Sequence, residues 1–388
     1  MPLDLSKDIV IRWENPEPSL AGLPEQTGIK AIGEAELQTL DLSPQRGGLW
    51  PGIRRPPTVD GRGDETASAS REPWVDANGY QVGYARALHP DRPAVLHYLP
   101  DKLDDRAVPF DSLELALIEA WCAGGNYILS LERDYREALR RRDPKALEAW
   151  RQLGRTAKWL QEKITLFRQP ATPTVTAVLD DGAAQLNSNL LYRRNVSPAL
   201  VPVTALPSPS QGKRIALVAA NLRPPRPQVK QMLAHAKRRH LIAASPASQQ
   251  WWRVSTLKSI RREKDREFFV LGKGQVVAYG RPIADPSEFA LDVIDIITHK
   301  QRSVRLWNAP AVIALATASP QSGEKLMHLI NYGSPIDIDI QARVQGQFSK
   351  ARLIRPDADP LMLETAKRGT MTEVQVPELR RLGVVKFS

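Results

Sequence analysis

The sequence predicts a protein of α/β plus all-β class. We expect a partial (β/α) barrel-like segment in residues 1–168, a flavodoxin-like domain in residues 169–300 and a small β-sandwich in residues 301–388. Three observations predict this order. A strand, a buried helix and a second strand lie between residues 94 and 131, apolar strands alternate with helices after residue 174, and short β runs fill the chain from residue 312. A chain of 388 residues is also too long for one ordinary core.

Parallel strands are the basis of the predicted barrel-like segment. Asp8–Trp13 is rich in β-forming residues, and Ala94–Leu99 and Asn126–Leu131 are apolar runs of strand length. Between the last two, Leu113–Ala123 is apolar nearly all round, which indicates a buried helix. Strand, helix and strand in this order form a βαβ unit, which implies a parallel sheet.

Capping residues predict where the helices of this segment begin and end. Asp111 and Glu114 have the spacing of a capping box, and the glycine pair at 124–125 is expected to end that helix. A long amphipathic helix is predicted from Asp143, as its N-cap, to Phe167. Cys122 lies in the apolar run, so we interpret it as a core residue, with a nucleophile as the alternative.

The second and third parts differ in the spacing of their apolar residues. After residue 174, strands are predicted at Thr174–Leu179, Ala199–Val203, Arg214–Ala220 and Leu241–Ala244, a hairpin at 268–279, and helices at 186–194, 227–239 and 287–298. In the last part, the runs at 312–318, 325–332, 336–344, 351–355, 361–365, 372–376 and 384–387 suggest a sandwich. Among them, Ile336–Val344 alternates apolar and polar residues as a half-buried strand does.

Composition and charge argue against several classes of function. No stretch approaches the ~20 apolar residues of a membrane helix, and the N-terminus lacks a signal-peptide pattern, so we expect a soluble protein of the cytoplasm and no membrane partner. The single cysteine excludes an internal disulfide and a cysteine-based metal site. The formal charge of +11 would suit nucleic acid, but the basic residues are scattered without interleaved aromatic residues. We therefore interpret them as solvated surface and do not expect nucleic acid as a partner.

The order of parts resembles the multidomain bacterial glycoside hydrolases of the beta-galactosidase kind. Three stretches carry the resemblance: Phe110–Leu129, which is similar to the last helix and strand of a barrel, Phe268–Tyr279, and Leu326–Tyr332. The resemblance covers roughly residues 94–388. It implies a (β/α)8 barrel, a class I glutamine-amidotransferase-like domain and a C-terminal β domain, with a carbohydrate as substrate or ligand and a homo-oligomer as a hypothesis for assembly.

Two departures from that family limit what the resemblance implies. A complete barrel needs eight strands and typically ~250 residues, whereas only about 168 residues precede the second part. The barrel is therefore expected to be partial, rearranged or cut from a longer parent. In addition, residues 169–300 contain no cysteine. A glutaminase needs a cysteine nucleophile, so we expect this amidotransferase-like domain to be structural.

Three acids follow predicted strands, where the catalytic groups of barrel enzymes stand. They are Glu14, Asp101 and Glu132. Glycoside hydrolysis uses two carboxylates, ~5–5.5 Å apart in retaining enzymes and ~6.5–9.5 Å apart in inverting ones. For each acid a structural role is the alternative: Glu14 as part of a turn, Asp101 as part of a solvated charged run, and Glu132 as a cap of the next helix.

Aromatic and polar residues near these acids are candidate sugar-binding groups. They are Trp13, Asn15, Trp50, Trp74, Asp76, Tyr80 and Tyr98. No histidine pair has metal-ligand spacing with an acid and no phosphate-binding loop is present, so we expect neither a metal nor a cofactor. Three hypotheses remain: a glycoside hydrolase-like enzyme, a catalytically silent relative that binds carbohydrate or serves assembly, and a basic nucleic-acid binder.

Overall fold

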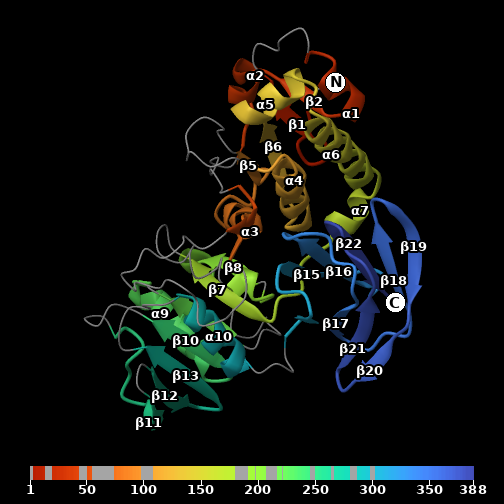
Figure 1. Ribbon diagram of the computed structural model, residues 1–388. Helices are drawn as coiled ribbons and strands as arrows, with labels where there is room; N and C mark the ends of the chain where they lie inside the picture. The colour runs from red at the N-terminus through yellow and green to blue at the C-terminus, as the bar shows by residue number, and fades with distance from the viewer. Residues whose placement is uncertain are drawn as a thin grey trace, which may run out of the picture.

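The computed structural model of the chain (Figure 1) has three successive groups of β-strands. It describes residues 3–13, 20–42, 50–54, 74–97, 108–179, 191–196, 198–206, 216–220, 222–244, 250–263, 266–279, 286–297 and 302–388. No helix in these ranges is long and apolar enough to cross a membrane.

The first group is a parallel sheet with helices beside it. Its described strands have the order β2-β1-β6-β5, with bounds β1 (Val10–Arg12), β2 (Lys30–Ile32), β5 (Val95–His97) and β6 (Asn126–Ser130). The helices are α1 (Leu23–Thr27), α2 (Glu34–Gln38), α3 (Gly79–Leu88), α4 (Ser112–Cys122), α5 (Arg133–Arg140), α6 (Pro144–Glu162) and α7 (Ile164–Phe167). Strands β3 (Gly52–Arg54) and β4 (Trp74–Asp76) pair antiparallel and form a separate two-stranded sheet.

Different helices pack against the two faces of this sheet. Side chains alternate along a strand, and Ile11 and Leu129 lie in one apolar cluster with α4 and α6, whereas Val10 and Ile128 lie in another with Leu37 of α2. We call these the α4 face and the α2 face. The predicted βαβ unit is confirmed, because β5, α4 and β6 follow one another and β5 and β6 pair in parallel.

Helix ends in this group are only partly as predicted. Asp143 caps α6 by accepting hydrogen bonds from the amides of Lys145 (2.7 Å) and Ala146 (3.3 Å), and Gly124 follows α4 with a left-handed φ of 82°. The long helix is interrupted at residue 163 between α6 and α7. The predicted capping box is wrong, because Asp111 makes no side-chain capping bond.

The second group is a mixed sheet with the described order β11-β12-β13-β10-β9-β7-β8. Strands β8, β7, β9, β10 and β13 are parallel, and β12 and β11 continue the sheet antiparallel. The elements are β7 (Val175–Leu179), β8 (Ala199–Pro202), β9 (Ala216–Ala220), α9 (Arg226–Ala236), β10 (His240–Ala244), β11 (Lys258–Arg262), β12 (Arg266–Leu271), β13 (Gly274–Tyr279) and α10 (Pro286–Ile297), with a 3-10 turn at Val203–Ala205. The predicted hairpin at 268–279 is confirmed as β12 and β13.

The third group contains two antiparallel sheets whose inner faces form a common core. One has the described order β14-β17-β21-β20 and the other β15-β16-β22-β18-β19. The strands are β14 (Val304–Trp307), β15 (Val312–Ala318), β16 (Lys325–Asn331), β17 (Ile340–Gln345), β18 (Ala351–Arg355), β19 (Ala358–Leu363), β20 (Ala366–Arg368), β21 (Met371–Val376) and β22 (Leu382–Phe387). The strand predicted at 336–344 begins only at Ile340, and Ile338 is 57% exposed.

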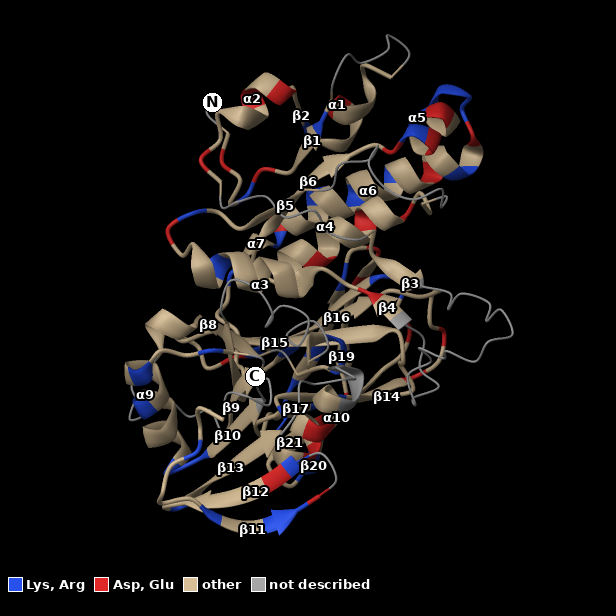
Figure 2. Ribbon diagram, turned by 90° about the vertical axis from the view of Figure 1, so that its left-hand side faces the viewer, with Lys and Arg blue, Asp and Glu red and all other residues tan. Residues whose placement is uncertain are grey.

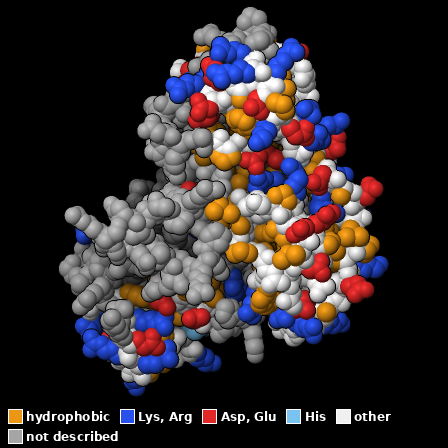
Figure 3. Space-filling model, in the orientation of Figure 1, with side chains coloured by type: hydrophobic (Ala, Val, Ile, Leu, Met, Phe, Trp, Pro, Cys, Tyr) orange, Lys and Arg blue, Asp and Glu red, His pale blue; other side chains and the backbone are white. Residues whose placement is uncertain are grey.

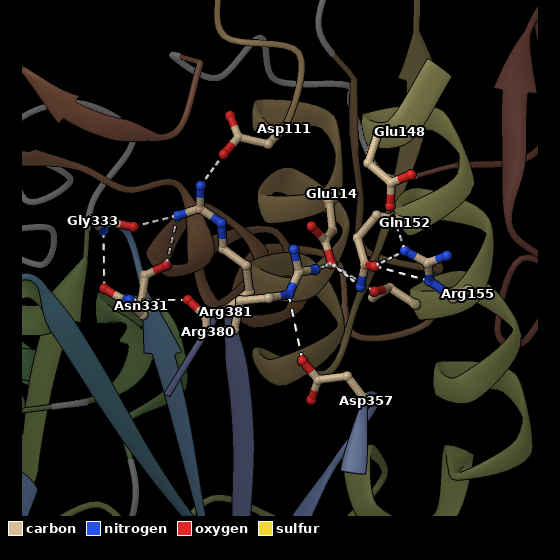
Figure 4. Close-up of polar contacts among 11 residues, drawn as sticks. Asp111, Glu114, Glu148, Gln152, Arg155, Asn331, Gly333, Asp357, Arg380 and Arg381 are labelled. Atoms are coloured by element: carbon tan, nitrogen blue, oxygen red, sulfur yellow. Dashed lines mark hydrogen bonds and ion pairs between the residues drawn. The ribbon is translucent and has the colours of Figure 1, made fainter. Parts of the chain in front are cut away.

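The first and third groups share one hydrophobic cluster. Ile313, Leu326 and Val384 of the sandwich pack in the same cluster as α4, and every residue of α4 is buried. Polar contacts cross the same boundary (Figure 4): Asp111 pairs with Arg381, and Glu114 lies 2.7 Å from Arg380. The two acids of the predicted capping box therefore form ion pairs that connect α4 to the sandwich.

Candidate active site at the carboxyl end of the parallel sheet

Three strands of the first sheet end at the same level. Arg12, the last residue of β1, pairs in register with Ile32 of β2 on one side and with Ser130 of β6 on the other. The segments after these strands therefore begin side by side. The end of a parallel sheet is where barrel enzymes place their catalytic groups.

A charged cluster lies on the α2 face at this end. Arg12 and His97 follow Val10 and Val95 by two residues, so alternation places both side chains on the α2 face. Arg12 Nε lies 3.0 Å from the Glu34 carboxylate. Glu34 opens α2, directly after β2 and Gly33. The cluster thus draws on the ends of β1, β2 and β5, with β6 lying between β1 and β5.

His97 is the histidine of this cluster and lies on β5, which β6 separates from β1. Its side chain is buried, and burial is the main cause that lowers the pKa of its imidazole below the ordinary value. The charge of Arg12 lowers this pKa further, and the charge of Glu34 opposes the shift. The imidazole is therefore neutral at pH 7 and carries one donor and one acceptor nitrogen.

Glu132 stands at the same end of the sheet, two residues after β6. It is the N-cap residue of α5, with an extended backbone (φ −69°, ψ 152°), but its side chain makes no capping hydrogen bond. The alternative placement of Glu132 at the cap of the next helix therefore holds for its position, without a side-chain capping bond. Its role as a catalytic carboxylate stays a prediction.

The described aromatic candidates lie on the other side of the sheet. The Trp13 ring contacts the Trp150 ring of α6 with centroids 6.1 Å apart. Trp50 and Tyr80 also pack against the α4-face cluster. The structure does not bring these three rings onto the α2 face beside His97. Glu14, Asn15, Tyr98 and Asp101 lie outside the described residues, as does the side chain of Trp74.

Asp76 belongs to a second polar cluster, at the junction of the three groups of strands. It is buried and lies 3.5 Å from Arg193. Close to it in sequence, Asn78 donates two hydrogen bonds of 2.8 Å to Glu119 of α4, one from its backbone and one from its side chain. Tyr332 of the sandwich donates a third to the same carboxylate at 2.7 Å.

Sequence analysis missed Arg12, Glu34 and His97 as a group. The strand that brings Glu34 into place, β2, has only three residues and no visible alternation. The sequence signal for this group is His97, a histidine at the end of an apolar strand. Within the described residues, no group of three or more His, Cys, Asp or Glu side chains could hold a metal ion.

Solved structures of two glycoside hydrolases are among those that resemble this chain. One is alpha-L-fucosidase isoenzyme 2 from Paenibacillus thiaminolyticus, with a TM-score of 0.55 and 9% identity, over 80% of this chain and 62% of that one. The other is a catalytic mutant of a GH42 beta-galactosidase from G. stearothermophilus, with a TM-score of 0.50 and 11% identity, over 80% of this chain and 56% of that one. No family model and no curated protein matches the sequence.

The resemblance found in the sequence is confirmed at the level of the fold. The chain is a mixed α/β protein with many strands and a glycoside hydrolase-like fold. It spans less than two thirds of the length of either structure.

Proposed function

We propose that the protein is glycoside hydrolase-like and acts on oligosaccharides through carboxylates at the carboxyl end of the parallel sheet. The observation that carries the proposal is the common level at which β1, β2 and β6 end, with Glu132 directly beyond β6. The fold shared with an alpha-L-fucosidase and a beta-galactosidase supports a carbohydrate as the substrate class.

Two carboxylates are needed, one to protonate the leaving oxygen and one to act as nucleophile or base. Glu14 follows the end of β1 by two residues, and Asp101 follows the end of β5 by four. Both strands are neighbours of β6 in the parallel sheet, which supports Glu14 or Asp101 as the partner of Glu132. In this proposal Arg12 and His97 bind and orient sugar hydroxyl groups beside the acids.

The arrangement on the α2 face favours a second candidate, a catalytically silent relative that binds carbohydrate or serves assembly. Glu34 is already engaged in an ion pair with Arg12. Leu5, Leu37 and Leu42 also fill the space against the sheet on this face. In a complete barrel that side of the strands forms the packed interior.

Hydrolysis of a panel of aryl glycosides distinguishes the two. The enzyme proposal expects turnover that falls by at least about a hundredfold in Glu132→Gln and in Glu14→Gln or Asp101→Asn, because general acid–base catalysis contributes roughly that much. The matched control is Glu162→Gln, an exposed residue at the opposite end of α6 from α5. Full activity in all three site variants would reject this site. Binding of oligosaccharide without turnover would support the silent relative.

The finer domain assignment is part of the same proposal. We infer a partial barrel-like segment in residues 1–168, an amidotransferase-like domain in residues 169–300 and a β-sandwich in residues 301–388. The lone cysteine supports a structural role for the middle domain, because Cys122 lies in α4, is buried, and has a thiol pKa that burial raises well above its usual value. A cytoplasmic location and a homo-oligomer stay predictions.

The surface supports the expectation that nucleic acid is not the partner. Basic residues are prominent at β11 and at the end of α9 (Figure 2). On the face shown in Figure 3, however, Lys and Arg side chains are interspersed with Asp and Glu. Arg261 of β11 also lies over the Phe268 ring at 3.9 Å from its centroid, so a guanidinium already covers the face of that ring.

A further inference from the structure

A cavity of about 540 Å³ lies between the second and third groups of strands. Its walls come from residues 193–195, from α10, and from β14 with the turn that follows it. The volume is within the range of small-molecule sites, ~300–1,000 Å³. None of its described lining residues belongs to the parallel sheet, so it is separate from the candidate active site.

Arg302 is a buried cation in the wall of this cavity. It is 8% exposed, and its guanidinium donates a hydrogen bond to the backbone carbonyl of Arg194. Its Nε is buried without a hydrogen-bond partner. No carboxylate of the described residues lies within ion-pair distance of Arg302. Buried cations are costly unless they are paired, so this guanidinium lacks the anion that normally accompanies it.

The surrounding charges add to this deficit. Burial, together with the charges of Arg305 and Arg194, lowers the pKa of Arg302 to about 10. Arg193 and Arg194 line the cavity, and Asp295 is the acid among its described lining residues. Because Asp295 is exposed on α10 and Asp76 already pairs with Arg193, neither carboxylate neutralises Arg302.

The other wall is apolar and aromatic. Leu291 of α10 and Leu306 of β14 line it, together with Trp307, over whose ring the guanidinium groups of Arg305 and Arg343 lie at 4.3 and 4.7 Å from the centroid. A bare ion would leave most of this volume and all of this wall unused. The site therefore combines a guanidinium for an oxyanion with a surface for the body of a small organic molecule.

We propose that this cavity binds a small organic anion, such as an acidic sugar, whose carboxylate, sulfate or phosphate group pairs with Arg302. The alternative is that Arg302 only links the sandwich to the middle part of the chain, through its hydrogen bond to the Arg194 carbonyl. The two alternatives make different predictions about binding. If Arg302 is only a structural link, no anion should bind in the cavity. The inference does not depend on the proposed hydrolase activity.

Isothermal titration of the full chain tests the proposal with glucuronate, glucose 6-phosphate, inorganic phosphate and glucose as probes. We expect saturable binding of at least one of the two sugar anions and none of glucose. Arg302→Met should weaken that binding about tenfold or more. The control Arg352→Met removes an exposed arginine of β18 in the other sheet, and should leave binding unchanged. Asp295→Asn should tighten anion binding roughly threefold, since the substitution removes a negative charge that repels the bound anion.

Each possible result of the titrations either supports the anion site or overturns it. Glucuronate alone or glucose 6-phosphate alone would identify the oxyanion while supporting the proposal. No binding of either sugar anion, binding of inorganic phosphate only, or equal binding by wild type and Arg302→Met would overturn it. If Arg302→Met does not fold, Asp295→Asn decides, because this exposed substitution preserves the fold. Unchanged or weaker anion binding in Asp295→Asn would then count against the site.

Discussion

Glu119 gives the sharpest prediction about stability, because it is a carboxylate in the interior of the molecule. It is fully buried in α4 and accepts hydrogen bonds from Asn78 and Tyr332. Burial raises the pKa of this carboxyl group from 4.5 to about 7, and the hydrogen bonds oppose the shift. The perturbation is Glu119→Gln, which keeps the shape and an acceptor oxygen but cannot ionise.

The magnitude follows from linkage between protonation and folding. A shift from 4.5 to about 7 corresponds to about 3 kcal/mol, at 1.36 kcal/mol per unit. The folded state binds the proton more tightly, so the stabilisation is complete below pH 4.5 and is lost as the pH rises through 7. Between pH 5 and pH 8 the wild type should lose about 2.5 kcal/mol of unfolding free energy through this residue.

Urea unfolding at pH 5, 6, 7 and 8 measures the effect. The unfolding free energy of Glu119→Gln minus that of wild type should rise by about 2.5 kcal/mol across this range. Glu162→Gln, an exposed control, should follow the wild type. Tyr332→Phe should destabilise the protein more at pH 8 than at pH 5, because hydrogen bonds to a charged group are the stronger ones. Parallel pH curves for wild type and Glu119→Gln would refute the reasoning.

Two further predictions concern packing between distant segments. Glu114→Gln removes the buried partner of Arg380 and should cost about 1–3 kcal/mol of unfolding free energy in urea titrations, whereas Glu148→Gln, an exposed change, should cost less than 1 kcal/mol. Gly274→Ala should lower the unfolding temperature markedly, since an added Cβ would overlap the backbone oxygen of Ala236, and such overpacking costs roughly 1–3 kcal/mol. An unchanged melting temperature would contradict that close approach.

Periodicity predicted the elements that have a clear apolar pattern. The apolar run of α4, the stripe of α6 and the strand–hairpin order around β12 and β13 are local properties of the sequence, and they were recognised. The segments α1, β2 and α2 have three to five residues each. That is too short for a period of two or 3.6 to be visible, and their burial depends on neighbours far along the chain.

The contacts that hold the parts together could not be predicted. Asp111 and Glu114 have the local spacing of a capping box, but their partners are 270 and 266 residues away in the sequence. An ion pair between residues far apart in the chain produces no repeating pattern in the sequence. The same holds for the cluster of Arg12, Glu34 and His97, since only the pairing of β1 with β2 brings Glu34 to Arg12.

The buried position of α4 explains how the four described strands of the parallel sheet can be part of a stable fold. An outer helix of a barrel normally exposes one face to water, but the sandwich covers that face of α4 here, through Tyr332, Arg380 and Arg381. Among the described strands, β2 and β5 form the edges of this sheet, and open edges invite pairing with another chain. At one edge every residue of β5 is buried. At the other, β2 is only three residues long and exposes Lys30. Short, charged edge strands resist pairing, so the sequence of β2 disfavours its use as an edge for association with a second chain.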